Sequence, residues 1–280
     1  MKRQKFLISR ILWRLPSTPY TYVGLCAPKL SSVENCYGHV FYIKAVSIDL
    51  TSPSGKRQHL ICGEQGDIPS WTGTGFLLSD GRFVTARHVI EAWAFPMDGK
   101  ELDKDMATLN IVANNGGKVI AQFSAISSSG VKFLFTSDQF VVNRQNDIVT
   151  RVKDNMRLVQ ARAGDTDYAY YRTGRTPGLP FNAKRSKVLP IDTKLKVLGF
   201  PYGLGVNSST DIEPIYGSAI VAKKGLQNGV ILTTDSNYEQ GNSGGPVFCE
   251  NEKGELEVVG LVSAGAGRNM GFIVPIAALI

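Results

Sequence analysis

Short runs in which hydrophobic and polar residues alternate recur along the chain from Val40 onward. Because a strand points successive side chains to opposite faces, such runs predict half-buried β-strands. Turn-forming pairs separate the runs, among them Ser54-Gly55, Asp80-Gly81 and Asn228-Gly229. The predicted strands are 40–50, 58–62, 75–79, 82–85, 108–113, 119–123, 131–136, 168–172, 194–200, 218–222, 230–234, 246–249, 257–263 and 271–274.

The distribution of these runs predicts an all-β fold, built as a sandwich or a barrel. Helical patterns do not alternate with the strands, so a parallel α/β sheet is not expected. Helix is predicted only in the N-terminal leader, at residues 89–95 just after His88, and at the C-terminus. The polar, charged stretch 137–166 is interpreted as an insertion.

The composition of the 280-residue chain is that of an ordinary globular protein, with 43% hydrophobic and 20% charged residues. It excludes a disordered, collagen-like or coiled-coil chain, and no apolar run approaches the roughly 20 residues of a membrane span. The four cysteines are too few for a disulfide scaffold, and no pair has CxxC spacing. The thiols are therefore expected to be free and mostly buried, and neither a metal site nor a cofactor is indicated.

The formal net charge of +7 is concentrated at the N-terminus. Residues 1–33 hold six cations and no acid, whereas the other 247 residues hold 25 basic and 24 acidic groups. A nearly neutral body does not support nucleic-acid binding. In the leader, Arg10 and Arg14 interrupt the apolar stretch that a secretory signal needs, so a cytoplasmic location is expected.

The first 16 residues fit a basic amphipathic helix that ends at Pro16. Arg3, Arg10 and Arg14 share one face of it, opposite a broad apolar face. Such a helix either packs on its own domain or uses the basic residues 1–33 to bind an anionic membrane surface or a protein partner.

The strongest local signal is the sequence GNSGGP at residues 241–246. Glycines on both sides of Ser243 allow the backbone to turn sharply and to approach a ligand closely. Such a turn can aim the N–H groups of Gly241 and Ser243 at one point, as an oxyanion hole requires. The motif also matches the nucleophile elbow of α/β-hydrolases, but that fold places its histidine after the serine, and none follows Ser243.

All three histidines, His39, His59 and His88, precede Ser243. Only His88 follows an apolar predicted strand, at a turn or short helix. A lone histidine beside apolar residues is more often a hydrogen-bonded core group, but the position of His88 ahead of GNSGGP favours a general base for Ser243. His39 and His59 are expected to be structural or exposed.

Five segments, in this order, resemble a trypsin-like serine protease: GTGFLLSDGRFVTARHVI, DTDYAYYR, VLGFPYG, GNSGGPVF and GLVSAGAGRNMGFIVPIAAL. The similarity is greatest to bacterial and viral members and to the HtrA-type catalytic domain. It covers residues 40–280 and implies two six-stranded antiparallel β-barrels with the active site in the cleft between them. The expected organisation is a leader and connection at 1–38 and a protease domain at 39–280, with the barrels at about 39–160 and about 161–280.

The resemblance implies a catalytic triad of His88, Asp167 and Ser243. The family's aspartate precedes an alanine in an apolar setting, which Asp167-Tyr168-Ala169 matches, and Asp147 is the alternative. Ser243 then attacks a peptide bond of a protein or peptide substrate and forms an acyl-enzyme, with His88 as base and Asp167 as its orienting partner. No cofactor is needed.

The resemblance also places the substrate pocket at Asn237, Ser263, Ala264 and Gly265. Asn237 stands where trypsin has its basic-selecting aspartate, so an uncharged P1 residue of moderate size is expected. Asn242 replaces the aspartate that pairs with a new N-terminus in trypsin-like zymogens, so activation of that kind is not expected. Two other functions stay open, a catalytically silent binding module and an esterase with the same nucleophile.

Overall fold

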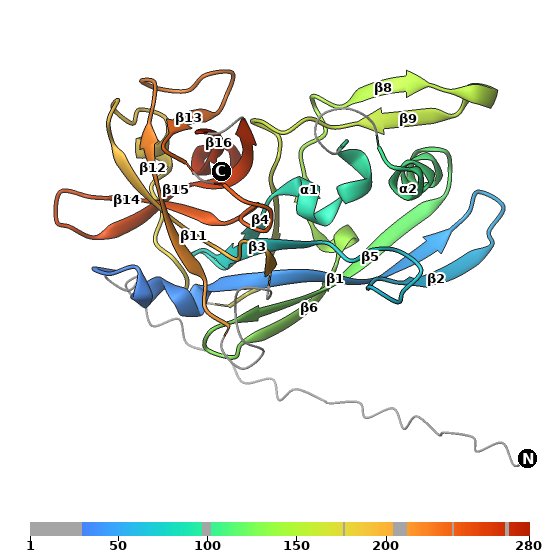
Figure 1. The fold of residues 1–280 in the computed structure, drawn as a ribbon, viewed down its shortest axis with the longest axis horizontal. Helices are drawn as coiled ribbons and strands as arrows, with labels where there is room; N and C mark the ends of the chain where they lie inside the picture. The colour runs from blue at the N-terminus through green and yellow to red at the C-terminus, as the bar shows by residue number, and fades with distance from the viewer. Residues whose placement is uncertain (1–29, 97–101, 176, 204–211, 237, 267–268) are drawn as a thin grey trace, which may run out of the picture.

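The protein has two large β-sheets that lie side by side and are linked by residues 173–193 (Figure 1). This computed structural model describes residues 30–280 except 97–101, 176, 204–211, 237 and 267–268. The predicted leader helix, with its membrane or protein partner, lies outside the described residues and stays a prediction. The all-β fold is confirmed.

The N-terminal sheet has eight antiparallel strands, in the order β6-β5-β1-β3-β4-β10-β7 with β2 paired to β1. The sheet curls into a half-barrel and does not close, because its two edge strands, β6 and β7, do not pair with each other. Its strands are β1 (Val40–Thr51), β2 (Arg57–Ile61), β3 (Thr72–Leu77), β4 (Arg82–Thr85), β5 (Lys118–Ser127), β6 (Lys132–Thr136), β7 (Val141–Val142) and β10 (Ala169–Arg172).

The C-terminal sheet is a closed six-stranded barrel, as predicted, in the order β11-β12-β13-β16-β15-β14. Its strands are β11 (Lys194–Gly199), β12 (Ile215–Val221), β13 (Ile231–Thr234), β14 (Pro246–Glu250), β15 (Leu256–Ala266) and β16 (Met270–Pro275). The first sheet continues past the predicted boundary near residue 160, because β10 pairs with β4.

The helical elements are short and lie between strands. Helix is found, as predicted, after β4 and at the C-terminus. The elements are η1 (Glu34–His39), α1 (Arg87–Ile90), η2 (Ala92–Ala94), α2 (Lys104–Asn114), η4 (Ser137–Gln139), η5 (Lys153–Asn155), α3 (Ala183–Ser186) and η7 (Ile276–Leu279).

The strand predicted at 108–113 is wrong, because this segment belongs to helix α2. The carboxylate of Asp103 caps the helix by accepting hydrogen bonds from the N–H groups of Asp105 and Met106, both at 3.0 Å. Within α2, the buried side chain of Asn110 donates to the carbonyl of Trp93 at 2.7 Å. Capping and this tertiary contact override the β-branched composition of the segment.

The stretch 137–166 contains a hairpin that sequence analysis missed. Strands β8 (Ile148–Arg151) and β9 (Arg157–Gln160) pair with each other in a separate two-stranded sheet, which extends beside α2 (Figure 1). All four residues of β8 are exposed, so the hairpin lacks the alternation that a half-buried strand shows.

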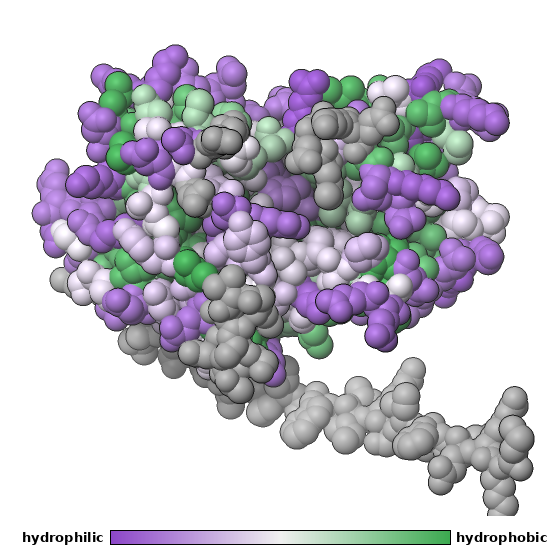
Figure 2. Space-filling view, in the orientation of Figure 1, coloured by the Kyte–Doolittle hydropathy of each residue, from purple (hydrophilic) through white to green (hydrophobic). Residues whose placement is uncertain are grey.

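The hydrophobic core runs from the first sheet into the second. Phe200 and Phe248, both fully buried, belong to the same cluster as the side chains of β1, β3 and β4. Figure 2 shows the surface hollowed between the two sheets, over α1. The continuous core holds the two sheets together below this hollow.

The ring of Phe83 on β4 is the centre of an aromatic cluster that fills the half-barrel. It is fully buried and contacts five other rings at centroid distances of 5.4–6.4 Å. We expect Phe83→Ala to lower the free energy of unfolding by about 3–5 kcal/mol, because the cavity left behind cannot collapse fully. Urea unfolding would measure this change.

The matched control is Leu134→Ala, which removes a side chain that is 82% exposed on β6 and should change stability by less than about 0.5 kcal/mol. Equal effects of the two substitutions would contradict the importance of the aromatic cluster.

Candidate active site

Two neighbouring strands bring His88 and Asp167 together. Strands β4 and β10 pair in antiparallel register, with Thr85 opposite Ala169. His88 follows the end of β4 on helix α1, and Asp167 precedes the start of β10. Residues 79 apart in sequence are therefore placed at the same end of one strand pair.

Asp167 binds His88 through both carboxylate oxygens. Oδ1 accepts the backbone N–H of His88 at 3.0 Å, and Oδ2 lies 2.8 Å from Nδ1 of the ring. Asp167 is fully buried, whereas the His88 side chain is 24% exposed. Nδ1 is occupied by the carboxylate, and the other ring nitrogen, Nε2, has no partner among the described residues.

The pKa of His88 reflects two opposing effects. Burial lowers it, while the negative charge of Asp167 and the hydrogen bond to that carboxylate raise it. The net pKa lies above the ordinary value of a histidine. The imidazolium form of His88 is thus stabilised relative to a free histidine.

Ser263 supplies a third hydrogen bond to Asp167, which sequence analysis did not foresee. Its Oγ donates to Oδ2 at 2.6 Å, and the side chain is 2% exposed on β15, at a break in register between Val262 and Ala264. The hydroxyl is thus committed to Asp167, so the predicted substrate contact is limited to the backbone of Ser263. The signal was present, because this serine is the one polar side chain in the apolar run 258–266.

The turn that carries Ser243 depends on its glycines. Gly241 has a φ of +102°, and a Cβ atom placed on it would lie 2.2 Å from the carbonyl oxygen of Phe200. Gly244 has a φ of +82°, and its Cβ would lie 2.3 Å from the carbonyl oxygen of Thr74. Only glycine fits both positions, which explains the GNSGGP sequence.

Thr74 on β3 holds this turn against the first sheet. Its backbone N–H donates to the carbonyl of Ser243 at 2.8 Å, and its Oγ1 donates to the carbonyl of Gly241 at 2.7 Å. The same Oγ1 accepts the N–H of Phe200 at 3.1 Å. A fully buried side chain of one sheet therefore fixes the serine loop of the other.

The two predicted oxyanion donors are the free ones in the turn. The N–H groups of Asn242, Gly244 and Gly245 each donate to a backbone carbonyl. Those of Gly241 and Ser243 donate to no acceptor among the described residues. Ser243 is half-buried, and its Oγ has no hydrogen-bond partner in the described part of the chain, His88 included.

Of the predicted pocket residues, Asn237 lies outside the described residues. Ala264 is half-buried and Gly265 is exposed, and both continue β15 past Ser263. Of the other histidines, His59 lies on β2 with its Nδ1 2.6 Å from Asp49 Oδ1, on an exposed surface.

A family model described as the trypsin-like peptidase domain matches residues 73–261. The chain belongs to this family. A search of curated proteins gave no match.

Solved structures similar to this trypsin-like peptidase chain include an HtrA-type protease with a tripeptide and the Rv3671c protease from M. tuberculosis in its active form. The HtrA-type protease is 13% identical with a TM-score of 0.46, over 87% of this chain and 58% of that one. The Rv3671c protease is 16% identical with a TM-score of 0.43, over 96% of this chain and 91% of that one. This chain thus spans less than two thirds of the HtrA-type chain.

Asp147, the alternative aspartate of this peptidase, forms a different ion pair. Its carboxylate binds the guanidinium of Arg87 through two hydrogen bonds of 2.6 and 2.8 Å. Arg87 is fully buried and also donates through Nε to Glu91 at 2.9 Å. Asp147 therefore binds Arg87, the residue before His88, and does not contact the His88 ring.

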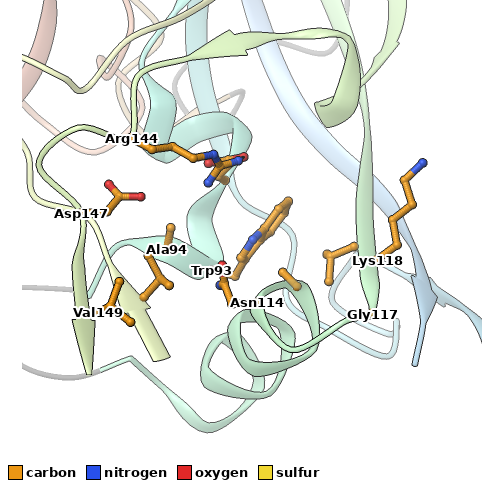
Figure 3. A pocket seen from close by; sticks show the side chains of 12 residues that line it. Trp93, Ala94, Asn114, Gly117, Lys118, Arg144, Asp147 and Val149 are labelled. Atoms are coloured by element: carbon orange, nitrogen blue, oxygen red, sulfur yellow. The ribbon is translucent and has the colours of Figure 1, made fainter. Parts of the chain in front are cut away.

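The Arg87 ion pairs border a cavity of about 540 Å³ between α2, β5 and the β8–β9 hairpin (Figure 3). Trp93, Arg144 and Asp147 line it, and Arg144 forms an ion pair with Glu91. Apart from Asp147, the alternative aspartate, none of the predicted site residues lines this cavity.

Within the described residues, no group of His, Cys, Asp and Glu side chains could hold a metal ion. The same part of the chain has no helix that is both long and apolar enough to span a membrane.

The buried Arg87–Asp147 pair generates a stability prediction. We expect Asp147→Asn to lower the free energy of unfolding by about 3 kcal/mol, because the charge of Arg87 then lacks one of its two buried carboxylate partners. The control Glu250→Gln breaks an exposed ion pair with Lys196 and should cost less than about 1 kcal/mol. Equal losses in urea unfolding would contradict a structural role for the buried pair.

Proposed function

We propose that this trypsin-like peptidase is a serine endopeptidase that uses His88, Asp167 and Ser243 as its catalytic triad. One observation carries the proposal: the buried carboxylate of Asp167 binds His88 Nδ1, while Nε2 has no partner among the described residues. This arrangement fixes the tautomer that a general base for a serine hydroxyl requires.

In the proposed reaction, Ser243 Oγ attacks the carbonyl carbon of the scissile peptide bond while Nε2 of His88 takes its proton. The carbonyl electrons move onto oxygen, and the N–H groups of Gly241 and Ser243 stabilise that charge. The His88 imidazolium, held by Asp167, then protonates the leaving amine, and an acyl-enzyme remains. Water repeats the sequence and releases the acid.

The free hydroxyl of Ser243 is compatible with this sequence. Catalytic hydrogen bonds are often long in proteins without substrate and shorten in the complex. Thr74 holds the backbone carbonyl of Ser243, and the Ser243 hydroxyl has no hydrogen-bond partner among the described residues.

We also propose that the peptidase needs no new N-terminus to form its oxyanion hole. Asn242 carries no charge, and its buried side chain lies against Gly199, whose Cβ would be 2.4 Å from Asn242 Oδ1. The donors of Gly241 and Ser243 are already unoccupied in the described structure. Asn242 therefore cannot form an ion pair with a new N-terminus, and the two N–H donors do not need such a pair to be available.

A fluorophosphonate probe tests the nucleophile. We expect it to label the wild type at Ser243 and to leave Ser243→Ala unlabelled, with peptide cleavage reduced roughly 10⁶-fold in that variant. Mass spectrometry of the adduct and a peptide library are the two measurements. The absence of labelling in the wild type would support a silent binding module, and labelling without peptide cleavage would support an esterase.

The raised pKa of His88 generates a pH prediction. Below that pKa, Nε2 carries a proton and cannot act as a base, so kcat/KM should rise with pH through a midpoint above about 6.5. In Asp167→Asn the charge that raises the pKa is gone while burial still lowers it. The midpoint should then fall, and the rate should drop about 10⁴-fold. An unchanged profile in Asp167→Asn would exclude Asp167 from the triad.

A further inference from the structure

A tyrosine ring lies on the bare face of Gly271 in β16. A Cβ atom placed on Gly271 would lie 2.1 Å from Cε2 and 2.6 Å from Cδ2 of Tyr238. It would also lie 2.7 Å from Oγ of Ser236. The ring and this hydroxyl therefore occupy the space that any larger residue at 271 would need.

This contact lies beside the serine loop. Tyr238 precedes Ser243 by five residues, and its carbonyl oxygen is 3.5 Å from the Cβ position of Gly265. Gly265 pairs with Gly271 and follows Ser263, whose Oγ binds Asp167. The ring thus lies against Gly271 on β16, and the backbone of Tyr238 lies next to Gly265, one of the residues at which the resemblance places the substrate pocket.

Several contacts hold the ring in this position. Tyr238 packs against the core of the closed barrel, and its hydroxyl lies 3.4 Å from Oγ1 of Thr233 on β13. Burial raises the pKa of Tyr238 to about 12, so the ring stays neutral at physiological pH. The ring is half-buried, and both its packing and its hydroxyl hold it in place.

The hydroxyl of Ser236 lies beneath the same space. The residue is 5% exposed, and its Oγ has no hydrogen-bond partner among the described residues. A buried hydroxyl without a partner is costly, so such groups are often found where a ligand atom or water completes the site. Ser236 and Tyr238 therefore border the same space next to Gly271, and the Tyr238 ring fills the part of it nearest Gly271.

We propose that Tyr238 sets the specificity of this peptidase by filling its P1 pocket, so that Gly, Ala or Ser is accepted and Leu or Phe is not. The inference rests on the proposed serine endopeptidase activity. The proposal also changes the expected substrate preference. The sequence predicted a P1 residue of moderate size, whereas we now expect a small one, because the ring takes up the space that a larger side chain would need.

The test compares peptides that differ only at P1 (Ala, Leu or Phe), cleaved by the wild type, Tyr238→Ala and Tyr238→Phe. We expect the wild type to cleave after Ala at least about 100-fold more efficiently than after Phe, judged by kcat/KM. Tyr238→Ala should raise kcat/KM for Phe at least about 10-fold relative to Ala, because it empties the pocket. Tyr238→Phe keeps the ring and should keep the wild-type preference.

Tyr216→Ala is the matched control, since it removes a tyrosine that is 50% exposed on β12 and should leave the P1 preference unchanged. Fluorophosphonate labelling of Ser243 in the wild type separates the two proposals. A labelled wild type that cleaves equally after Phe and Ala would overturn the role of Tyr238, even if Tyr238→Ala does not fold. An unlabelled wild type would overturn the peptidase proposal itself.

Discussion

The buried carboxylate of Asp167 is the constraint on which the rest of the structure depends. A buried charge is costly unless donors surround it, and Asp167 receives hydrogen bonds from the backbone and ring of His88 and from Oγ of Ser263. The two partners belong to different sheets, so the charge is satisfied only when the sheets are docked. The contacts that orient His88, the proposed base, therefore depend on the docking of the two sheets.

A second set of contacts crosses the same boundary. Thr74, on the first sheet, hydrogen-bonds to the carbonyls of Gly241 and Ser243, on the loop of the second. Together with Asp167, it fixes the histidine and the serine loop relative to each other on rigid strands. Tyr238 lies on the chain segment that leads into that loop, so the proposed nucleophile Ser243 and the residue proposed to fill the P1 pocket belong to one segment.

Sequence patterns predicted most strands of the two large sheets, including β4, which is buried on both faces, and they singled out His88 and Ser243 as candidate site residues. They did not indicate two interactions whose partners are distant in sequence, whereas the pairing of Asp167 with His88 was implied by the resemblance. The hydroxyl of Ser263 finds Asp167 across 96 residues, and Asp147 finds Arg87 across 60. Helix α2 was missed because a cap and buried contacts outweigh β-branched residues, and β8 was missed because all of its side chains are exposed.

The most direct test of this account is the proton between His88 and Asp167. Proton NMR of the wild type should show a hydrogen-bonded Nδ1 resonance of His88 far downfield of the amides, since Nδ1 lies 2.8 Å from the Asp167 carboxylate. Asp167→Asn should abolish this resonance, whereas Asp147→Asn should retain it. Its absence from the wild type, or its survival in Asp167→Asn, would contradict the central role of the Asp167 carboxylate.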